Sequence, residues 1–135
     1  MHGNLLRKET TGKIIKAFYY VYNELGYGFL EKVYENALVI VLRKHGCKVV
    51  QQVPVKVYFE GELVGDYFAD LVVNDCVIVE LKAAELISEA HESQLVNYLR
   101  ATDMEVGLLL NFGPKPVFRR KVFSNARKAR SIERG

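Results

Sequence analysis

The chain has 135 residues, of which 50% are hydrophobic and 26% are charged, and its formal net charge is +3. These values are typical of one soluble globular domain whose core is large enough to fold without a disulfide or a structural metal. The two cysteines, Cys47 and Cys76, match no metal-ligand spacing, so we expect reduced thiols rather than a disulfide scaffold. The sequence therefore predicts a single domain over residues 1–135.

Location and charge distribution give two further expectations. No apolar run approaches the ~20 residues of a transmembrane helix, and residues 1–8 lack the apolar core of a signal peptide, so we expect a cytoplasmic protein that enters no membrane. Residues 119–135 contain seven Lys or Arg and one acid, which leaves the remainder net negative. A basic C-terminal tail on an acidic body suits contact with a polyanion, although a solvated chain end has the same composition.

Two amphipathic helices are predicted at the start of the chain, over residues 10–25 and about 31–45, each followed by a glycine. The second helix carries Glu31 and Glu35 one turn apart, and both continue its apolar stripe toward the edge of the core. A glutamate in the first turn complements the helix dipole, which explains Glu31 well and Glu35 less well.

Strand-like runs follow this helical pair. They cover residues 48–53, 55–60, 63–73 and 77–82, before a helix at about 88–101, a buried strand at 105–111 and a candidate edge strand at 117–123. The helix between the last two buried runs allows a right-handed crossover between parallel strands. We therefore expect an α/β fold in which helices flank a mixed β-sheet.

Three charged residues interrupt two apolar runs that form a predicted β-hairpin. The dipeptide Asn74-Asp75 supplies turn chemistry between a run that contains Asp70 and a run that contains Glu80 and Lys82. Glu80 and Lys82 are two residues apart and share a face of the sheet. A solvated surface pair is the ordinary explanation of a Glu-x-Lys triplet, but charges inside buried strands tend to mark functional sites.

The hairpin register decides whether Asp70 joins the other two residues. A three-residue loop at 74–76 places Asp70 opposite Glu80, whereas a two-residue loop turns Asp70 to the other face. Facing carboxylates destabilise a sheet unless something neutralises them, and a divalent cation is a good partner because hard cations take oxygen ligands. Without a cluster of His or Cys, this donor set favours Mg²⁺ or Mn²⁺ over Zn²⁺.

The predicted helix at 88–101 presents His91, Gln94 and Tyr98 on one face, at positions i, i+3 and i+7. This row indicates the polar edge of a site. The ordinary alternative is an exposed Gln94 beside a Tyr98 that packs in the core.

Together these residues resemble the PD-(D/E)XK nuclease superfamily. Asp70 and Glu80-Leu81-Lys82 are similar to its core motif, with Ala69 in place of the motif's proline. The segment Gly28-Phe29-Leu30-Glu31-Lys32-Val33-Tyr34 resembles the signature of the GxxExxY family within that superfamily. Gln94 and Tyr98 resemble the motif that follows the lysine in RecB-like nucleases.

This resemblance, which runs from about residue 10 to residue 123, implies a restriction-endonuclease-like core. It implies metal-dependent hydrolysis of phosphodiester bonds, in DNA rather than RNA. By the same likeness Asp70, Glu80, the Leu81 carbonyl and a glutamate of the second helix hold the ion. Glu31 is the signature glutamate, whereas Glu35 has the spacing seen in archaeal Holliday-junction resolvases, and we prefer Glu35.

The resemblance also implies roles for the remaining candidates. Lys82 would position the attacking water and offset growing negative charge, and the neighbouring carboxylates favour its charged form. Gln94 would orient Lys82, water or nucleic acid. Contacts to nucleic acid are expected from Tyr98 and His91 and from the basic residues Arg119, Arg120 and Lys121.

Two functions of another class stay open: a module on the same fold that binds nucleic acid or protein without turnover, and a regulatory partner in an oligomer. The intact Asp, Glu, Lys and Gln set argues against loss of activity, because a non-catalytic relative could shed costly buried charges. A domain this small offers little surface for reading bases. We therefore expect recognition of nucleic-acid shape or backbone, with a homodimer as one arrangement.

Overall fold

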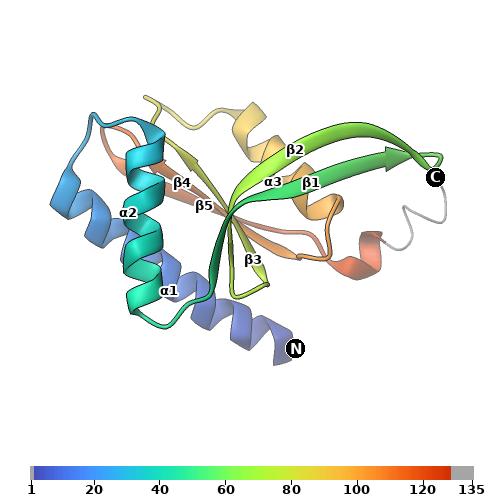
Figure 1. Cartoon of the computed structure of the whole chain (residues 1–135), viewed down its shortest axis with the longest axis horizontal. Helices are drawn as coiled ribbons and strands as arrows, with labels where there is room; N and C mark the ends of the chain where they lie inside the picture. The colour runs from blue at the N-terminus through green and yellow to red at the C-terminus, as the bar shows by residue number, and fades with distance from the viewer. Residues whose placement is uncertain (1, 129–135) are drawn as a thin grey trace.

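The structure is a computed structural model that describes residues 2–128, with side chains from residue 7 onward. Its elements, in chain order, are α1 (His2–Leu25), α2 (Glu31–Lys44), β1 (Val49–Phe59), β2 (Glu62–Val73), β3 (Val77–Lys82), α3 (Glu89–Arg100), β4 (Val106–Phe112) and β5 (Pro116–Val122) (Figure 1). The strands form one sheet in the order β1-β2-β3-β4-β5. Only β3 and β4 are parallel, and α3 connects them. The predicted mixed sheet with helices is therefore confirmed, as is the N-terminal helical pair.

Two hydrophobic cores lie on the two faces of this sheet. In the first, α1 and α2 pack on the sheet, and Phe112 contacts the Phe18 ring edge-on and stacks on Tyr34, with centroids 4.8 and 4.4 Å apart. In the second, Leu95, Tyr98 and other α3 residues pack on the opposite face. Because β3 contributes to both cores, the strand that carries Glu80 is buried on each side.

Two predicted boundaries were wrong. The first helix begins at His2 rather than near residue 10. The two runs predicted on either side of Pro54 form one strand, β1, so three strands precede α3 instead of four. Proline lacks a backbone N–H and breaks a central strand, but β1 lies at the edge of the sheet, where that donor is dispensable.

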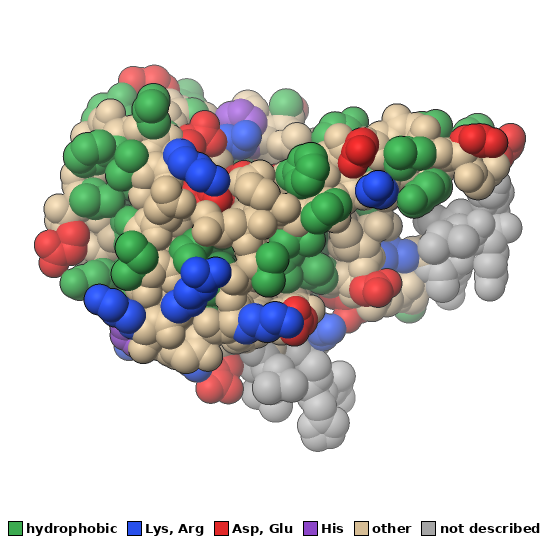
Figure 2. Space-filling model, in the orientation of Figure 1, with side chains coloured by type: hydrophobic (Ala, Val, Ile, Leu, Met, Phe, Trp, Pro, Cys, Tyr) green, Lys and Arg blue, Asp and Glu red, His purple; other side chains and the backbone are tan. Residues whose placement is uncertain are grey.

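The far halves of β1 and β2 form a two-stranded ribbon that extends beyond the rest of the sheet (Figure 1). Its tip is a two-residue turn at Glu60 and Gly61, both with positive φ. The register shifts between Val57 and Tyr58, next to the pair of Val57 and Gly65. Hydrophobic side chains gather over the ribbon (Figure 2), and exposed members are Tyr58, Phe59, Leu63, Val64, Tyr67 and Phe68.

The basic segment is not a free tail from residue 119, because the candidate edge strand at 117–123 is present as β5. Arg119, Arg120 and Lys121 lie in β5, the other edge strand. Residues 125–128 form a helical turn in which Lys128 is buried and donates to the carbonyls of Thr102 and Met104. The rest of the expected tail, residues 129–135, lies outside the described residues. What is described of this segment therefore belongs to the folded domain.

Both cysteines carry free thiols, as expected, and Cys47 is buried. Among the described helices, none is sufficiently long and apolar to cross a membrane.

The second core depends on a close approach between α3 and β4. A Cβ on Gly107 would lie 2.7 Å from Cδ1 and 3.1 Å from Cγ of the buried Leu95, so Gly107→Ala should lower the free energy of unfolding by about 1–3 kcal/mol. Gly12→Ala is the matched control, because nothing lies within 4 Å of that site and alanine favours a helix by about 0.5–1 kcal/mol. Urea denaturation measures both, and equal stabilities of the two variants would contradict the packing argument.

Candidate active site

The hairpin between β2 and β3 has the three-residue loop that brings Asp70 opposite Glu80. Val73 pairs with Val77, and the loop residues Asn74 and Asp75 both have positive φ, at 52° and 55°. The Cys76 N–H donates to the Val73 carbonyl at 3.1 Å and closes the loop. The register that places the two carboxylates together is therefore the observed one.

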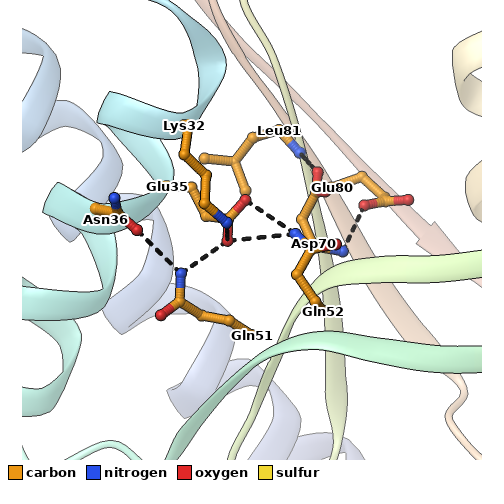
Figure 3. Close-up of polar contacts among 8 residues, drawn as sticks. All are labelled: Lys32, Glu35, Asn36, Gln51, Gln52, Asp70, Glu80 and Leu81. Atoms are coloured by element: carbon orange, nitrogen blue, oxygen red, sulfur yellow. Dashed lines mark hydrogen bonds and ion pairs between the residues drawn. The ribbon is translucent and has the colours of Figure 1, made fainter.

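The two carboxylates lie where the ladder between β2 and β3 ends. The last paired residues are Leu71 and Val79. Beyond them, the Asp70 N–H donates to Glu80 Oε2 at 2.9 Å, and the Leu81 N–H donates to Asp70 Oδ2 at 2.8 Å (Figure 3). Each carboxylate thus accepts a backbone N–H of the opposite strand. The strands part here, and the opening is filled by acidic oxygens.

Glu80 is the most perturbed acid of the site. It is 5% exposed, and burial, followed by the negative charge of Asp70 and a hydrogen bond between the two side chains, raises the pKa of Glu80 to about 9. The positive charge of Lys82 opposes this shift only weakly. Without a cation, the pair therefore binds a proton at neutral pH.

The same chemistry fits a hard divalent cation. The available ligand atoms are carboxylate oxygens, and Asp70 is partly exposed. The repulsion between the two carboxylates favours binding of a proton to Glu80, and a bound cation would relieve the same repulsion. Among the described residues, no three Asp, Glu, His or Cys side chains are grouped closely enough to hold an ion as they stand. The Asp70–Glu80 pair therefore offers two carboxylates side by side, and an ion bound there would need further ligands.

The chain segment after Lys82 is fixed by two residues that the sequence analysis missed. Lys82 pairs with Asn111 on β4, and the buried Asn111 side chain bonds both the N–H and the carbonyl of Ala84, at 3.0 and 2.9 Å. Gly113 allows this approach, since a Cβ there would lie 2.1 Å from the Ala84 oxygen. Asn111 could have been noticed in the sequence, because it is a polar residue in an otherwise apolar buried strand.

The two helix glutamates have different surroundings. Glu31 is exposed in the first turn of α2. Glu35 is 4% exposed and accepts hydrogen bonds from Lys32 Nζ at 2.9 Å, Gln51 Nε2 at 2.7 Å and Gln52 Nε2 at 3.1 Å. Gln52 lies across the ribbon from Asp70, so Glu35 rather than Glu31 is linked to the surroundings of the pair (Figure 3). Neither glutamine was singled out from the sequence.

The three α3 candidates divide by role. Tyr98 is 5% exposed, and burial with the nearby negative charges of Glu80 and Asp70 raises the pKa of Tyr98 to about 12, so this ring borders the acidic pair from inside the core. His91 and Ser88 cap the N-terminus of α3. The His91 ring Nδ1 accepts from the backbone N–H of Ser88, and the backbone N–H of His91 donates to Ser88 Oγ. Gln94 is partly exposed on the same helix.

The three basic candidates are not gathered into one patch. Arg119 and Lys121 pair with Leu109 and Gly107 and so face α3, where Lys121 Nζ lies 2.8 Å and Arg119 Nε 4.0 Å from Glu92 Oε1. The hydrogen bond from Lys121 lowers the pKa of Glu92. Arg120 alternates to the opposite face and is exposed. The described part of β5 therefore offers partly neutralised charge on one face and a single exposed arginine on the other.

Comparison with known proteins identifies the class of this fold. The family model of the PD-(D/E)XK nuclease superfamily matches residues 8–122, and the chain belongs to that superfamily. No curated protein matches the chain.

Solved structures that are similar to it include the following two. The crystal structure of SSO0001 is 19% identical with a TM-score of 0.52, and the likeness covers 76% of this chain and 56% of that one, so the chain spans little more than half of that protein. Such a likeness concerns the fold alone. The Archaeoglobus fulgidus Hjc, a Holliday junction resolvase from an archaeal hyperthermophile, is 22% identical with a TM-score of 0.42, over 66% of this chain and 72% of that one.

The proton on Glu80 makes stability depend on pH. The ordinary pKa of this group is 4.5, so between about pH 5 and pH 9 the folded protein binds a proton that the unfolded chain does not, and the free energy of unfolding falls as pH rises. Glu80→Gln should abolish that slope and be more stable at pH 8 by at least about 1.4 kcal/mol, the value of a tenfold change in proton affinity.

Urea denaturation in EDTA at pH 5, 7 and 9 checks this prediction. Glu92→Gln is the control, because Glu92 is a partly exposed acid whose pKa is lowered, so its substitution leaves the slope in this window unchanged. A Glu80→Gln protein with the wild-type slope would show that Glu80 is not the proton-binding group.

Proposed function

We propose that this protein is a nuclease of the GxxExxY family that hydrolyses phosphodiester bonds of nucleic acid, DNA in preference to RNA, with the help of Mg²⁺ or Mn²⁺. The observation that carries the proposal is the facing pair of Asp70 and Glu80, with Lys82 on the same strand, in a chain of the PD-(D/E)XK nuclease superfamily. Two facing buried acids lower the stability of the fold, and binding of a cation would compensate for their repulsion.

The signature of the GxxExxY family has a physical basis in this structure. Gly28 has φ +119°, a conformation that other residues rarely adopt. The fully buried Tyr34 donates from its hydroxyl to the Gly26 carbonyl at 2.6 Å and accepts from the Phe29 N–H at 3.2 Å. The glycine and the tyrosine therefore fix the turn from which α2 begins at Glu31, and α2 in turn carries Glu35. These roles support the assignment to the family.

The residues of the site would divide the work as follows. Asp70 and Glu80 would hold the ion, together with the Leu81 carbonyl, Glu35 and water. The bound ion supplies a Lewis acid that stabilises charge on the scissile phosphate and lowers the pKa of a water molecule. Lys82 lies two residues beyond Glu80, so its ammonium group offsets negative charge as it grows on the phosphate.

Gln94 and Tyr98 approach from α3. The Gln94 amide, which is partly exposed, can orient the attacking water or a phosphate oxygen. The buried ring of Tyr98 forms the inner wall of the site and keeps that side of the acidic pair dry. A dry wall strengthens the electrostatic interactions of Lys82 with the phosphate.

A cleavage assay tests the function. In Mg²⁺ or Mn²⁺ the wild-type protein should cut single-stranded, duplex or branched DNA faster than RNA, and EDTA should stop it. Lys82→Ala and Asp70→Asn should each lower the rate at least about 100-fold, the scale of losing one electrostatic contact in the transition state. Lys44→Ala, an exposed lysine in the last turn of α2, is the control and should cut at the wild-type rate.

Two outcomes would contradict this proposal. Identical products and rates from wild type and Lys82→Ala would exclude the proposed site. Tight binding of nucleic acid without cleavage of any substrate would favour a module that binds without turnover.

We also propose a homodimer, with the β1–β2 ribbon as its contact surface. A two-stranded ribbon is marginally stable by itself, and this one exposes Tyr58, Phe59 and Phe68 by 61%, 61% and 53%. The acids Glu60, Glu62 and Asp66 near its tip would repel phosphates, which favours protein as the partner.

Analytical ultracentrifugation checks this arrangement. Wild-type protein should sediment as a dimer, whereas the double variant Tyr58→Ser, Phe68→Ser should sediment as a monomer at the same concentration. Gly12→Ala, which lies on α1, should leave the dimer intact. A monomeric wild-type protein at about 100 μM, a concentration that saturates dimers with micromolar dissociation constants, would contradict the proposal.

A further inference from the structure

Gln52 has a backbone conformation that a strand residue rarely adopts. Its φ is +53°, although it is not a glycine and lies inside β1. The β1–β2 pairing runs through Gln51–Leu71 and resumes at Val53–Ala69, and the intervening position lies opposite Asp70. The irregular residue of β1 is therefore the neighbour of the proposed metal ligand of β2.

Both strands of this pair change cores near Gln52. Val49 packs in the first core, with α1 and α2, whereas Val55 packs in the second core, with α3. Odd-numbered residues of a regular strand would share one face. On β2, Leu71 and Ala69 divide between the same two cores, so both strands leave the first core at this position and cover the second.

At the same position, two consecutive amides of β1 reach one carboxylate. Successive strand side chains normally point to opposite faces, yet Gln51 Nε2 and Gln52 Nε2 both donate to Glu35, at 2.7 and 3.1 Å (Figure 3). Gln51 also donates to Asn36 on α2 at 3.1 Å. Gln52 lies across from Asp70 on the neighbouring strand, and its amide connects that position to the buried Glu35.

We propose that Gln52 is a positioning residue that acts through Glu35. Its left-handed backbone brings its amide to Glu35, and that contact sets the third carboxylate relative to the Asp70–Glu80 pair. Strained backbone persists where the surrounding structure requires it, and it clusters at functional sites. Groups that orient a metal ligand have a measurable effect on metal affinity even though they never touch the ion. The inference rests on the proposed function, because it concerns the same cation site.

Two substitutions separate the amide from the backbone. Gln52→Gly removes the amide and accepts positive φ freely. Gln52→Asn keeps an amide and tolerates positive φ, but it is one methylene too short to reach Glu35 from the same backbone. Glu60→Gly is the matched control, because Glu60 has φ +51° at the tip of the ribbon, away from the site.

The experiment titrates Mn²⁺ into each full-length protein by electron paramagnetic resonance and measures its melting temperature in EDTA. Both Gln52 variants should lose about 10-fold or more in Mn²⁺ affinity, as typical for a residue that orients a ligand, without a lower melting temperature. Glu60→Gly should keep the wild-type affinity. In the cleavage assay, excess Mn²⁺ should restore the rate of Gln52→Gly but not that of Asp70→Asn.

The outcomes distinguish the two proposals. Wild-type Mn²⁺ affinity in both Gln52 variants would overturn the positioning role and leave the nuclease proposal standing. A lower melting temperature of both variants with unchanged affinity would assign Gln52 to stability alone and likewise overturn it. A wild-type protein that binds no Mn²⁺, or an Asp70→Asn protein that binds it equally well, would overturn the proposed cation site and this inference with it.

Discussion

The repulsion between Asp70 and Glu80 is the constraint on which the rest of the structure depends. Two carboxylates face each other between β2 and β3, and like charges in facing strand positions destabilise a sheet. The strands respond by ending their ladder at Leu71 and Val79, and the acidic oxygens replace the missing backbone acceptors. On the other side of that boundary, the closed end of the hairpin is fully paired and buried. The repulsion between the two carboxylates is therefore confined to the place where β2 and β3 separate.

The central position of β3 makes this arrangement tolerable. It is paired on both edges and covered on both faces, so the loss of ladder bonds on one edge leaves the other edge and both cores intact. The parallel connection through α3 leads the chain from the end of β3 across the sheet face on which Tyr98 borders the acids. Asn111 and Gly113 on the neighbouring strand then fix the segment that follows Lys82. The charged residues of β3, the Tyr98 ring of α3 and the supporting Asn111 and Gly113 thus come from adjacent parts of one β–α–β crossover unit.

Local sequence rules predict much of this arrangement. The spacing of apolar residues predicts the helices and the hairpin, but it leaves the hairpin register open between a two-residue and a three-residue loop. The structure has the three-residue loop, which brings Asp70 to Glu80. The same rules divide β1 at Pro54, because they do not know that β1 is an edge strand. They predict the edge strand at 117–123, but they also describe residues 119–135 as a basic tail, since basic composition alone does not show that Lys128 binds two buried carbonyls.

The residues of the site that the sequence did not predict were missed for the same reason. Gln51, Gln52 and Asn111 are polar residues whose importance depends on a partner far away in sequence, and no local pattern names that partner. Gln52 is the hardest to predict, because its role requires a positive φ for which glutamine has no preference. Asn111 is easier, since an amide within a buried apolar strand breaks the pattern of its neighbours.

The structure balances the negative charges of the site in two different ways. Glu80 is buried beside another acid and binds a proton, whereas Glu35 is buried among hydrogen-bond donors, namely Lys32 and two glutamine amides. If a cation binds the Asp70–Glu80 pair as proposed, it must displace that proton. In the proposed site the acidic pair would attract the ion, and the two glutamines would place Glu35 as a further ligand. On the proposed function, the fold separates attraction of the ion from its orientation and assigns them to different strands.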